Sequence, residues 1–159
     1  MIIELTKEEF AYAAQIGRLR QEEALRKNLP DKYGFDGVGG LAVHVEGAAG
    51  ELAVAKALNI TWDATVNTFK SLADLVSNIE VRTRSKDYYD LLVRSDDKDE
   101  SLFVLVTRKS PRTFDVVGWI KAKDAKQEQW VKTHGNRPPA YFVPKTVLQN
   151  MESCPVKST

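Results

Sequence analysis

Four short segments with strand character follow one another between residues 78 and 120, and they constrain the fold of this chain more than any other feature. They read NIEVRTR, DLLVRS, SLFVLVTR and TFDVVGWI, and each contains the β-branched or aromatic side chains that are typical of strands. Residues 102–106 are uninterrupted apolar, which indicates a strand that is covered on both faces. The sequence therefore predicts a sheet of about four strands with residues 102–106 near its centre.

The first of these segments alternates in character. Residues 79, 81 and 83 point to one face of a strand, whereas Glu80, Arg82 and Arg84 point to the other. Glu80 and Arg82 then project from the same side, about 6–7 Å apart. The acidic run SDDKDE stands between residues 93 and 102, and we expect it to be the loop of a hairpin.

Two helices are predicted before the strands. Thr6 and Glu9 have the spacing of a capping box, which places a helix at residues 7–27. The run LAVHVEGAAGELAVAKALN predicts a second helix at 41–59. Its apolar and glycine positions recur at helical spacing: Val43, Gly47, Gly50, Val54 and Leu58. A glycine inside a helix costs about 1 kcal/mol relative to alanine, so we expect this face to lie against the sheet, where missing side chains allow close approach.

The remaining segments complete the fold class. DKYGFDGVGG at 31–40 is a loop without a phosphate-binding glycine motif, KAKDAKQEQWVK is helical in composition, and a proline-containing stretch leads to an edge strand at 141–143. The order predicts an α/β (α+β) protein with a mixed central sheet of about four to five strands flanked by helices. We expect one domain over 1–159, made of an N-terminal part (1–40), a core (41–120) and a C-terminal helix and tail (121–159).

Composition excludes several classes of protein. Hydrophobic residues make up 43% of the 159, and charged residues 28%, which are ordinary globular values. No apolar run approaches the roughly 18–20 residues that cross a bilayer, and MIIELTKEEF lacks the apolar region of a signal peptide. Cys154 is the only cysteine, so neither an internal disulfide nor a cysteine zinc site is expected. These features predict a cytoplasmic protein, and the net charge of +1 neither indicates nor excludes nucleic-acid binding.

Three carboxylates stand in an order that suggests metal chemistry. Glu51 lies on the second predicted helix, Asp74 follows it, and Glu80 lies on the first strand. Asp74 is six residues before Glu80, so a turn between them brings both side chains to one end of the strand. Carboxylate oxygens are the ligands that Mg²⁺ prefers, and a bound metal ion activates water. Asp90 and Asp63 are alternatives to Asp74.

The segment GAAGELAVAKAL, the aspartate after it and then IEVRTR resemble the PD-(D/E)XK superfamily of nucleases over roughly residues 44–120. The resemblance implies a restriction-endonuclease-like core and Mg²⁺- or Mn²⁺-dependent cleavage of DNA. Asp74 and Glu80 would then be metal ligands, and Glu51 would contact the metal through water. EVRTRS, VVGWI with KDAK, and RPPAYFVP are also similar to small phage and prophage proteins, which implies a phage-encoded protein in the host cytoplasm.

One position departs from the family pattern. Arg82 stands where these nucleases usually carry a lysine. Arginine has a pKa above about 12 and cannot act as a general base, although it can clamp a phosphate and stabilise charge. Either cleavage persists, with a metal-bound hydroxide as nucleophile or with Lys86 or Lys109 in place of the usual lysine, or the fold is kept without catalysis. In the second case the chain binds nucleic acid or a host protein.

Four further residues are candidates for contacts to nucleic acid. His44, Arg84, Lys86 and Lys109 are the candidates, each set against a plain structural role. The aromatic residues Tyr88, Tyr89 and Trp119 fit the core or its rim better than a base-stacking surface. Small nucleases of this type often need a second subunit to cut both strands, so a homodimer is also an expectation.

Overall fold

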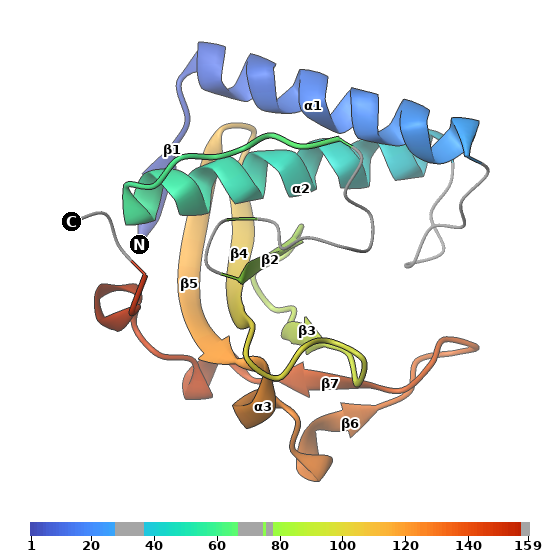
Figure 1. The fold of residues 1–159 in the computed structure, drawn as a ribbon, viewed down its shortest axis with the longest axis vertical. Coiled ribbons are helices and arrows are strands. Elements are labelled where there is room, and N and C mark those ends of the chain that lie inside the picture. Colours follow the sequence, from blue (N-terminus) through green and yellow to red (C-terminus); the bar gives the residue numbers. More distant parts are fainter. Residues whose placement is uncertain (28–36, 67–74, 76–77, 157–159) are drawn as a thin grey trace.

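The computed structural model describes residues 1–27, 37–66, 75 and 78–156, and in this part the chain forms three layers (Figure 1). Two long helices form the first layer, a four-stranded mixed sheet the second, and a three-stranded sheet with a short helix the third. The expected α+β class with a mixed central sheet is confirmed. In the described part no helix is long and apolar enough to span a membrane.

The central sheet has the strand order β1-β5-β4-β2. Its strands are β1 (Ile2–Glu4), β5 (Thr113–Lys121), β4 (Leu102–Ser110) and β2 (Ile79–Arg84). β2 runs parallel to β4, and the other neighbours are antiparallel. The predicted central position of residues 102–106 is confirmed, because β4 lies between two strands and these residues are buried. The strand at residues 2–4 was not predicted, since three residues are too few to show a period.

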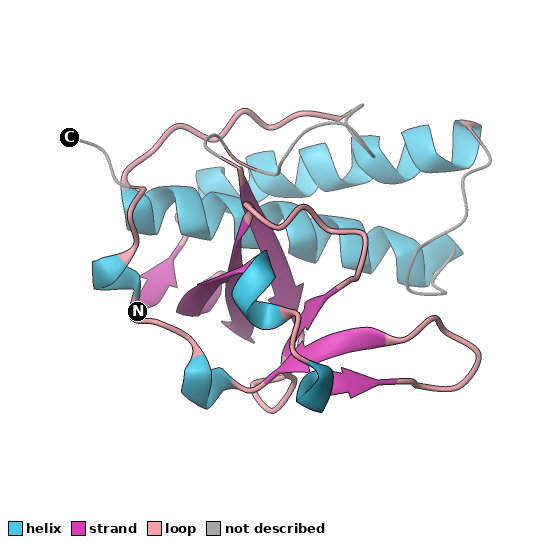
Figure 2. Ribbon diagram, turned by 60° about the horizontal axis from the view of Figure 1, so that its bottom comes forward, coloured by secondary structure: helices cyan, strands magenta, loops and turns pink. Residues whose placement is uncertain are grey.

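The two predicted helices are present as α1 (Lys7–Arg26) and α2 (Gly37–Leu58). α2 begins four residues earlier than predicted, so the prediction of a loop was wrong for residues 37–40. The capping box forms as expected: the Thr6 amide donates to Glu9 Oε1 at 2.8 Å, and the Glu9 amide donates to Thr6 Oγ1 at 3.0 Å. α1 packs on α2 through Gly17, where a Cβ would lie 2.5 Å from the Cα of Val45. Figure 2 shows both helices on one side of the central sheet.

The expectation that a glycine face of α2 lies against the sheet is confirmed at one of its two glycines. A Cβ on Gly50 would lie 1.8 Å from Oγ1 of Thr83 in β2, so only glycine permits this approach. A Cβ on Gly47 would meet nothing within 4 Å. The close contact at Gly50 fixes the position of α2 over β2, and it thereby places the side chains that flank it.

The central sheet separates two hydrophobic cores. The first lies between the sheet and the helices, and it includes Ile79, Val81, Val104 and Val106 from the sheet. The second lies between the sheet and the third layer. It contains Leu91, Val93, Phe103, Leu105, Ile120, Ala122, Ala125 and Val143. β4 supplies side chains to both cores, which explains its continuous apolar sequence.

The acidic run does not form the predicted hairpin. The small sheet has the order β3-β7-β6, with β3 (Leu91–Val93), β7 (Ala140–Val143) and β6 (Val131–Lys132). β3 pairs with β7, whereas β4 belongs to the central sheet, so residues 94–101 connect two sheets. The prediction was wrong because it assumed that strands adjacent in sequence also pair. All three side chains of β3 are buried, which requires cover from a distant segment.

Two expectations for the C-terminal region were also wrong. The strand near residue 141 is the middle strand of its sheet and not an edge, because the prolines at 138 and 139 precede β7 and leave its amides free to pair. Only Ala122–Ala125 (α3) of the predicted helix is α-helical, and a 3₁₀ turn at Glu128–Trp130 (η1) follows. Two further 3₁₀ turns, Lys145–Val147 (η2) and Met151–Ser153 (η3), end the described chain.

Candidate functional site

The face of β2 that points away from α2 carries the predicted charged residues. Ile79 and Val81 are buried in the first core, and Thr83 meets α2 at Gly50. Because side chains alternate along a strand, Glu80, Arg82 and Arg84 lie on the opposite face, toward the third layer. The predicted alternation is confirmed. It places the acid and the two arginines on one surface at the edge of the central sheet.

Arg82 is held between two carboxylates. Its Nη1 lies 3.9 Å from Oε2 of Glu80, and its Nη2 lies 3.4 Å from Oδ2 of Asp97. Its Cζ also lies 4.8 Å from the centre of the Phe103 ring on β4. All three charged side chains are largely buried, with exposed fractions of 16% for Arg82, 23% for Glu80 and 19% for Asp97. We call Glu80, Arg82 and Asp97 the Arg82 cluster.

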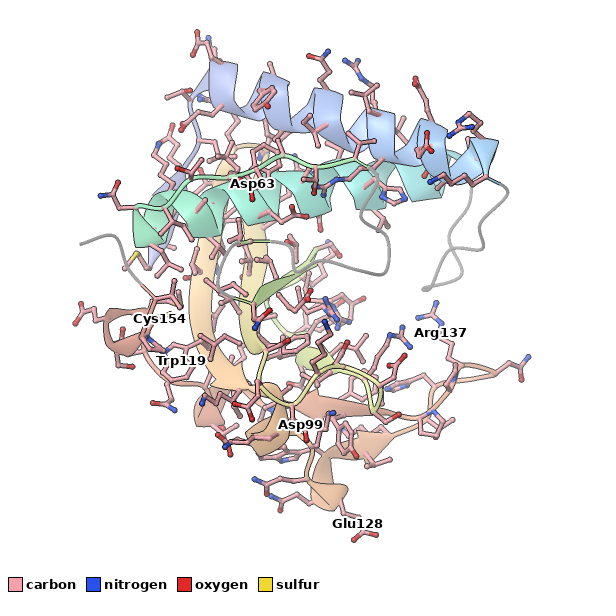
Figure 3. All side chains as sticks on the ribbon, in the orientation of Figure 1. Asp63, Asp99, Trp119, Glu128, Arg137 and Cys154 are labelled. Carbon is pink, nitrogen blue, oxygen red and sulfur yellow. The ribbon has the colours of Figure 1, made fainter. Side chains whose placement is uncertain are left out.

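Asp97 was not among the residues singled out from the sequence. Its Oδ2 also accepts a hydrogen bond from the Arg94 amide at 2.7 Å, which orients the carboxylate toward β2. The loop that carries it is anchored by Lys126, whose Nζ donates to the carbonyls of Ser95 and Asp97 and to Oδ1 of Asp99. Asp99 is labelled in Figure 3. The density of acids in SDDKDE was the only signal, and it does not distinguish Asp97 from its neighbours.

Glu51 has a different environment. Nη1 of Arg20 donates to its Oε2 at 2.6 Å, and Nη2 donates to its Oε1 at 3.0 Å, which makes a bidentate pair between α2 and α1. Trp62 Nε1 also donates to Oε1, at 3.1 Å. Nε of Arg20 donates to the carbonyl of Thr65, so the segment after α2 closes over the pair. The carboxylate of Glu51 is therefore turned toward the helical layer, whereas Glu80 faces the opposite side of the central sheet.

The aspartate of the predicted metal set cannot be placed, because Asp74 lies outside the described residues. Of its two alternatives, Asp63 is exposed beside α2 (Figure 3), and Asp90 precedes β3. Among the residues that the structure describes, no three His, Cys, Asp or Glu side chains are grouped to hold a metal ion. The structure brings Glu80 together with Asp97, and it brings Glu51 together with Arg20.

The four residues predicted to contact nucleic acid lie in two parts of the structure: one on α2, and three around the C-terminal end of β2. Arg84 stacks on Tyr89, with its Cζ 4.6 Å from the ring centre, and its Nη1 donates to the Asp90 carbonyl at 3.1 Å. Lys109, near the end of β4, has its Nζ 3.6 Å from Oδ2 of Asp87. Lys86 is exposed in the same β2–β3 connection, whereas His44 is half-buried on α2. Arg84, Lys86 and Lys109 therefore gather around one turn.

No family model matches this chain, and neither a curated protein nor a solved structure matches it. The likeness to PD-(D/E)XK nucleases thus stays a prediction from the sequence.

Proposed function

We propose that this protein binds nucleic acid through the β2 face, on a nuclease-like core in which arginines, and not a metal ion, accompany the acids. The observation that carries the proposal is the pairing of the two described acids of the predicted set, Glu51 and Glu80, with guanidinium groups. Arg20 holds Glu51 in a bidentate contact, and Arg82 lies within 4 Å of Glu80 and Asp97. An arginine remains protonated at any physiological pH, so the positive charge beside these acids does not depend on pH.

Glu51 does not suit the role that the family resemblance gives it. A metal ion near its carboxylate would have to displace Arg20, whose side chain is only 15% exposed. Removing one partner of a buried ion pair costs about 3–5 kcal/mol, because the other charge stays buried without compensation. The pair also joins α1, α2 and the segment at 62–65. We therefore assign Glu51 to the stability of the helical layer.

The basic side chains of the β2 face suit phosphate contacts. Arg82 and Arg84 project from one face of the strand, and Lys86 and Lys109 lie beyond its C-terminal end. Arginine and lysine contacts to the phosphate backbone supply affinity that depends little on sequence. Arg84, Lys86 and Lys109 lie near Asp87 and Asp90, so the local excess of positive charge is small. We therefore expect micromolar binding that weakens as salt increases.

The experiment is a binding assay beside a cleavage assay. Labelled DNA is titrated with wild type, Arg84→Ala, Lys109→Ala and the control Lys7→Ala, which removes an exposed lysine from the first turn of α1. We expect Arg84→Ala and Lys109→Ala to weaken binding several-fold and Lys7→Ala to leave it unchanged. No product should form with Mg²⁺ or Mn²⁺. Equal losses in all three variants would contradict the proposed surface.

The second candidate is the metal-dependent DNA nuclease that the resemblance implies. It is favoured by one observation: two carboxylates, Glu80 and Asp97, converge on a single guanidinium at the edge of the sheet. In that case they would hold Mg²⁺ or Mn²⁺, which activates a water molecule. Calorimetric titration of Mn²⁺ into wild type and Glu80→Ala separates the candidates. Saturable binding that Glu80→Ala abolishes supports the nuclease, whereas no binding to either protein supports recognition without cleavage.

We further propose a cytoplasmic setting. The lone cysteine, Cys154, is buried in the first core as a free thiol. A buried thiol without a disulfide partner suits a reducing compartment.

A further inference from the structure

Two adjacent tyrosines stand at the turn that follows β2, and core packing does not account for both. Tyr88 is 69% exposed and Tyr89 37% exposed. Their ring centres lie 4.7 Å apart with an angle of 53° between the rings. Tyr89 is explained by its stacking on Arg84, with a distance of 4.6 Å from Cζ to the ring centre. Tyr88 extends beyond that stack into solvent.

The turn that carries these rings is fixed at several points. The Tyr89 amide donates to the Lys86 carbonyl at 3.3 Å, which closes the turn. Arg84 Nη1 donates to the Asp90 carbonyl at 3.1 Å, and Lys109 Nζ lies 3.6 Å from Oδ2 of Asp87. The tyrosines are thus held against the ends of β2 and β4. A ring that is already positioned loses little conformational entropy when it contacts a ligand.

The charges around the turn suit a nucleic-acid strand. Arg84, Lys86 and Lys109 are the cations, and Asp87 and Asp90 are the nearby acids. The hydroxyl of Tyr89, through its hydrogen bond to Tyr88, raises the pKa of Tyr88, and the charge of Asp87 adds to this shift. A tyrosine phenol is uncharged at neutral pH, so Tyr88 does not repel phosphate. Exposed aromatic rings beside basic side chains are the combination by which proteins bind single strands.

We propose that Tyr88 and Tyr89 form a stacking platform for unpaired bases, so that the ligand of the β2 face is single-stranded nucleic acid. This inference rests on the nucleic-acid binding proposed above and names its substrate class. A base inside a duplex is already stacked on both faces, whereas an unpaired base can lie on an aromatic side chain. Arg84 backs the platform and contacts phosphate, and the Tyr88 ring receives the base.

The small local charge excess has a consequence for the salt dependence. Binding that rests mainly on phosphate contacts weakens steeply with salt, by a slope of about −0.7 per phosphate neutralised on a single strand. Stacking adds affinity without adding to this slope. We therefore expect the slope to correspond to about two or three phosphates, and Tyr88→Ala should lower affinity without changing it.

The test compares a labelled 12-nucleotide oligo-dT with a duplex of the same length. Each is titrated with the full chain in EDTA. The proteins are wild type, Tyr88→Ala, Tyr88→Phe and the control Tyr12→Ala, which removes another exposed tyrosine, on α1. We expect a preference for the single strand and a loss of about 5- to 150-fold in Tyr88→Ala, the range for one base–aromatic stack. Tyr88→Phe keeps the ring and should bind like wild type, as should Tyr12→Ala.

The outcomes separate this inference from the function on which it rests. Equal affinity for single strand and duplex, with no effect of Tyr88→Ala, overturns the platform and leaves nucleic-acid binding standing. A loss in Tyr88→Phe as large as in Tyr88→Ala overturns stacking in favour of a hydroxyl contact. Binding to neither DNA overturns the proposed function and the platform together. Because Tyr88 is exposed, its substitution should leave the thermal unfolding midpoint unchanged, which a melting curve checks.

Discussion

Two arginine–carboxylate contacts lie on opposite faces of the central sheet, and they differ in geometry. Arg20 and Glu51 form a bidentate pair at 2.6 and 3.0 Å between two helices, and Trp62 donates a further hydrogen bond. The Arg82 guanidinium instead makes two longer contacts, at 3.9 Å to Glu80 and at 3.4 Å to Asp97. The first contact is short, directed and joins three segments. The second is longer and shared.

The difference separates a structural role from a ligand-binding role. A bidentate guanidinium–carboxylate contact uses parallel hydrogen bonds and resists exchange. A guanidinium at 3.4–3.9 Å from two acids makes weaker contacts, so an incoming phosphate can compete for it. Of the two described acids that the family resemblance assigns to catalysis, Glu51 and Glu80, one therefore stabilises the helical layer. The other lies on the surface that we propose for recognition.

The largest expected effect breaks the first contact. Glu51→Ala should lower the free energy of unfolding by about 3–5 kcal/mol, because Arg20 is left buried without its partner. Urea denaturation measures the change. The control Glu100→Gln removes an exposed pair with Lys121, whose charges are 3.9 Å apart, and should change stability by less than about 1 kcal/mol. An Arg20→Met, Glu51→Leu double variant should recover much of the loss, and a failure to recover it would count against a purely structural pair.

The second prediction concerns the Arg82 cluster. Arg82→Ala should cost about 2–3 kcal/mol, because the hydrogen bond of the guanidinium to Asp97 and its ion pair with Glu80 are lost. It also leaves Glu80 and Asp97 facing each other without the cation. We expect the variant to gain Mn²⁺ binding that wild type lacks, measured by calorimetry. The double variant Arg82→Ala, Glu80→Ala should lose that binding, and if it does not, the metal is bound elsewhere.

The third prediction uses the two glycines of α2 as a matched pair. Gly50→Ala should destabilise the protein by about 1–2 kcal/mol, because its Cβ would lie 1.8 Å from Thr83 Oγ1 and force α2 from β2. Gly47→Ala has open space and should stabilise the helix by about 0.5–1 kcal/mol. Thermal unfolding measures both. The same sign in both variants would contradict the close contact between α2 and β2.

The smallest expected effect concerns the more exposed ion pair between Glu9 and Lys56. It tests how much the contribution of an ion pair to folding stability depends on burial. The Thr6 amide lowers the pKa of Glu9, and Lys56 at 2.9 Å lowers it further. Because the folded pKa lies below the unfolded value, this contribution is present above about pH 4.5 and is lost as pH falls through the folded pKa. Wild type should exceed Glu9→Gln in stability by less than about 1 kcal/mol at pH 7, and the gap should narrow as the pH falls below about 4.5. A gap that persists at low pH would contradict the assignment.

Local patterns in the sequence predicted the main elements but not their partners. The capping box at Thr6, the helical spacing around Gly50 and the alternation in β2 are local signals, and each element formed as expected. The pairing of β3 with β7 joins segments about 50 residues apart, and the sequence of neither segment indicates its partner strand. Burial of β3 on all sides, and not turn chemistry, decides that pairing.

The candidate site was predictable to the same degree. The alternation of β2 was sufficient to place Glu80, Arg82 and Arg84 on one face. The partner of Glu51 was not predictable, because Arg20 is 31 residues away and has the sequence context of a solvated helix. The sequence does not distinguish Asp97 from the neighbouring acids, because the position of its carboxylate depends on contacts made by Lys126 and by the Arg94 amide. Ion pairs of this kind follow from tertiary packing, which a single sequence does not display.

The central claim, recognition by the β2 face without a metal ion, is tested most directly by fluorescence anisotropy of labelled single-stranded DNA in EDTA and again in Mn²⁺. We expect saturable binding in EDTA, affinity unchanged by Mn²⁺, an intact oligonucleotide after incubation, and weaker binding by Arg84→Ala. Binding that requires Mn²⁺ and is followed by cleavage would contradict the account and establish the nuclease in its place.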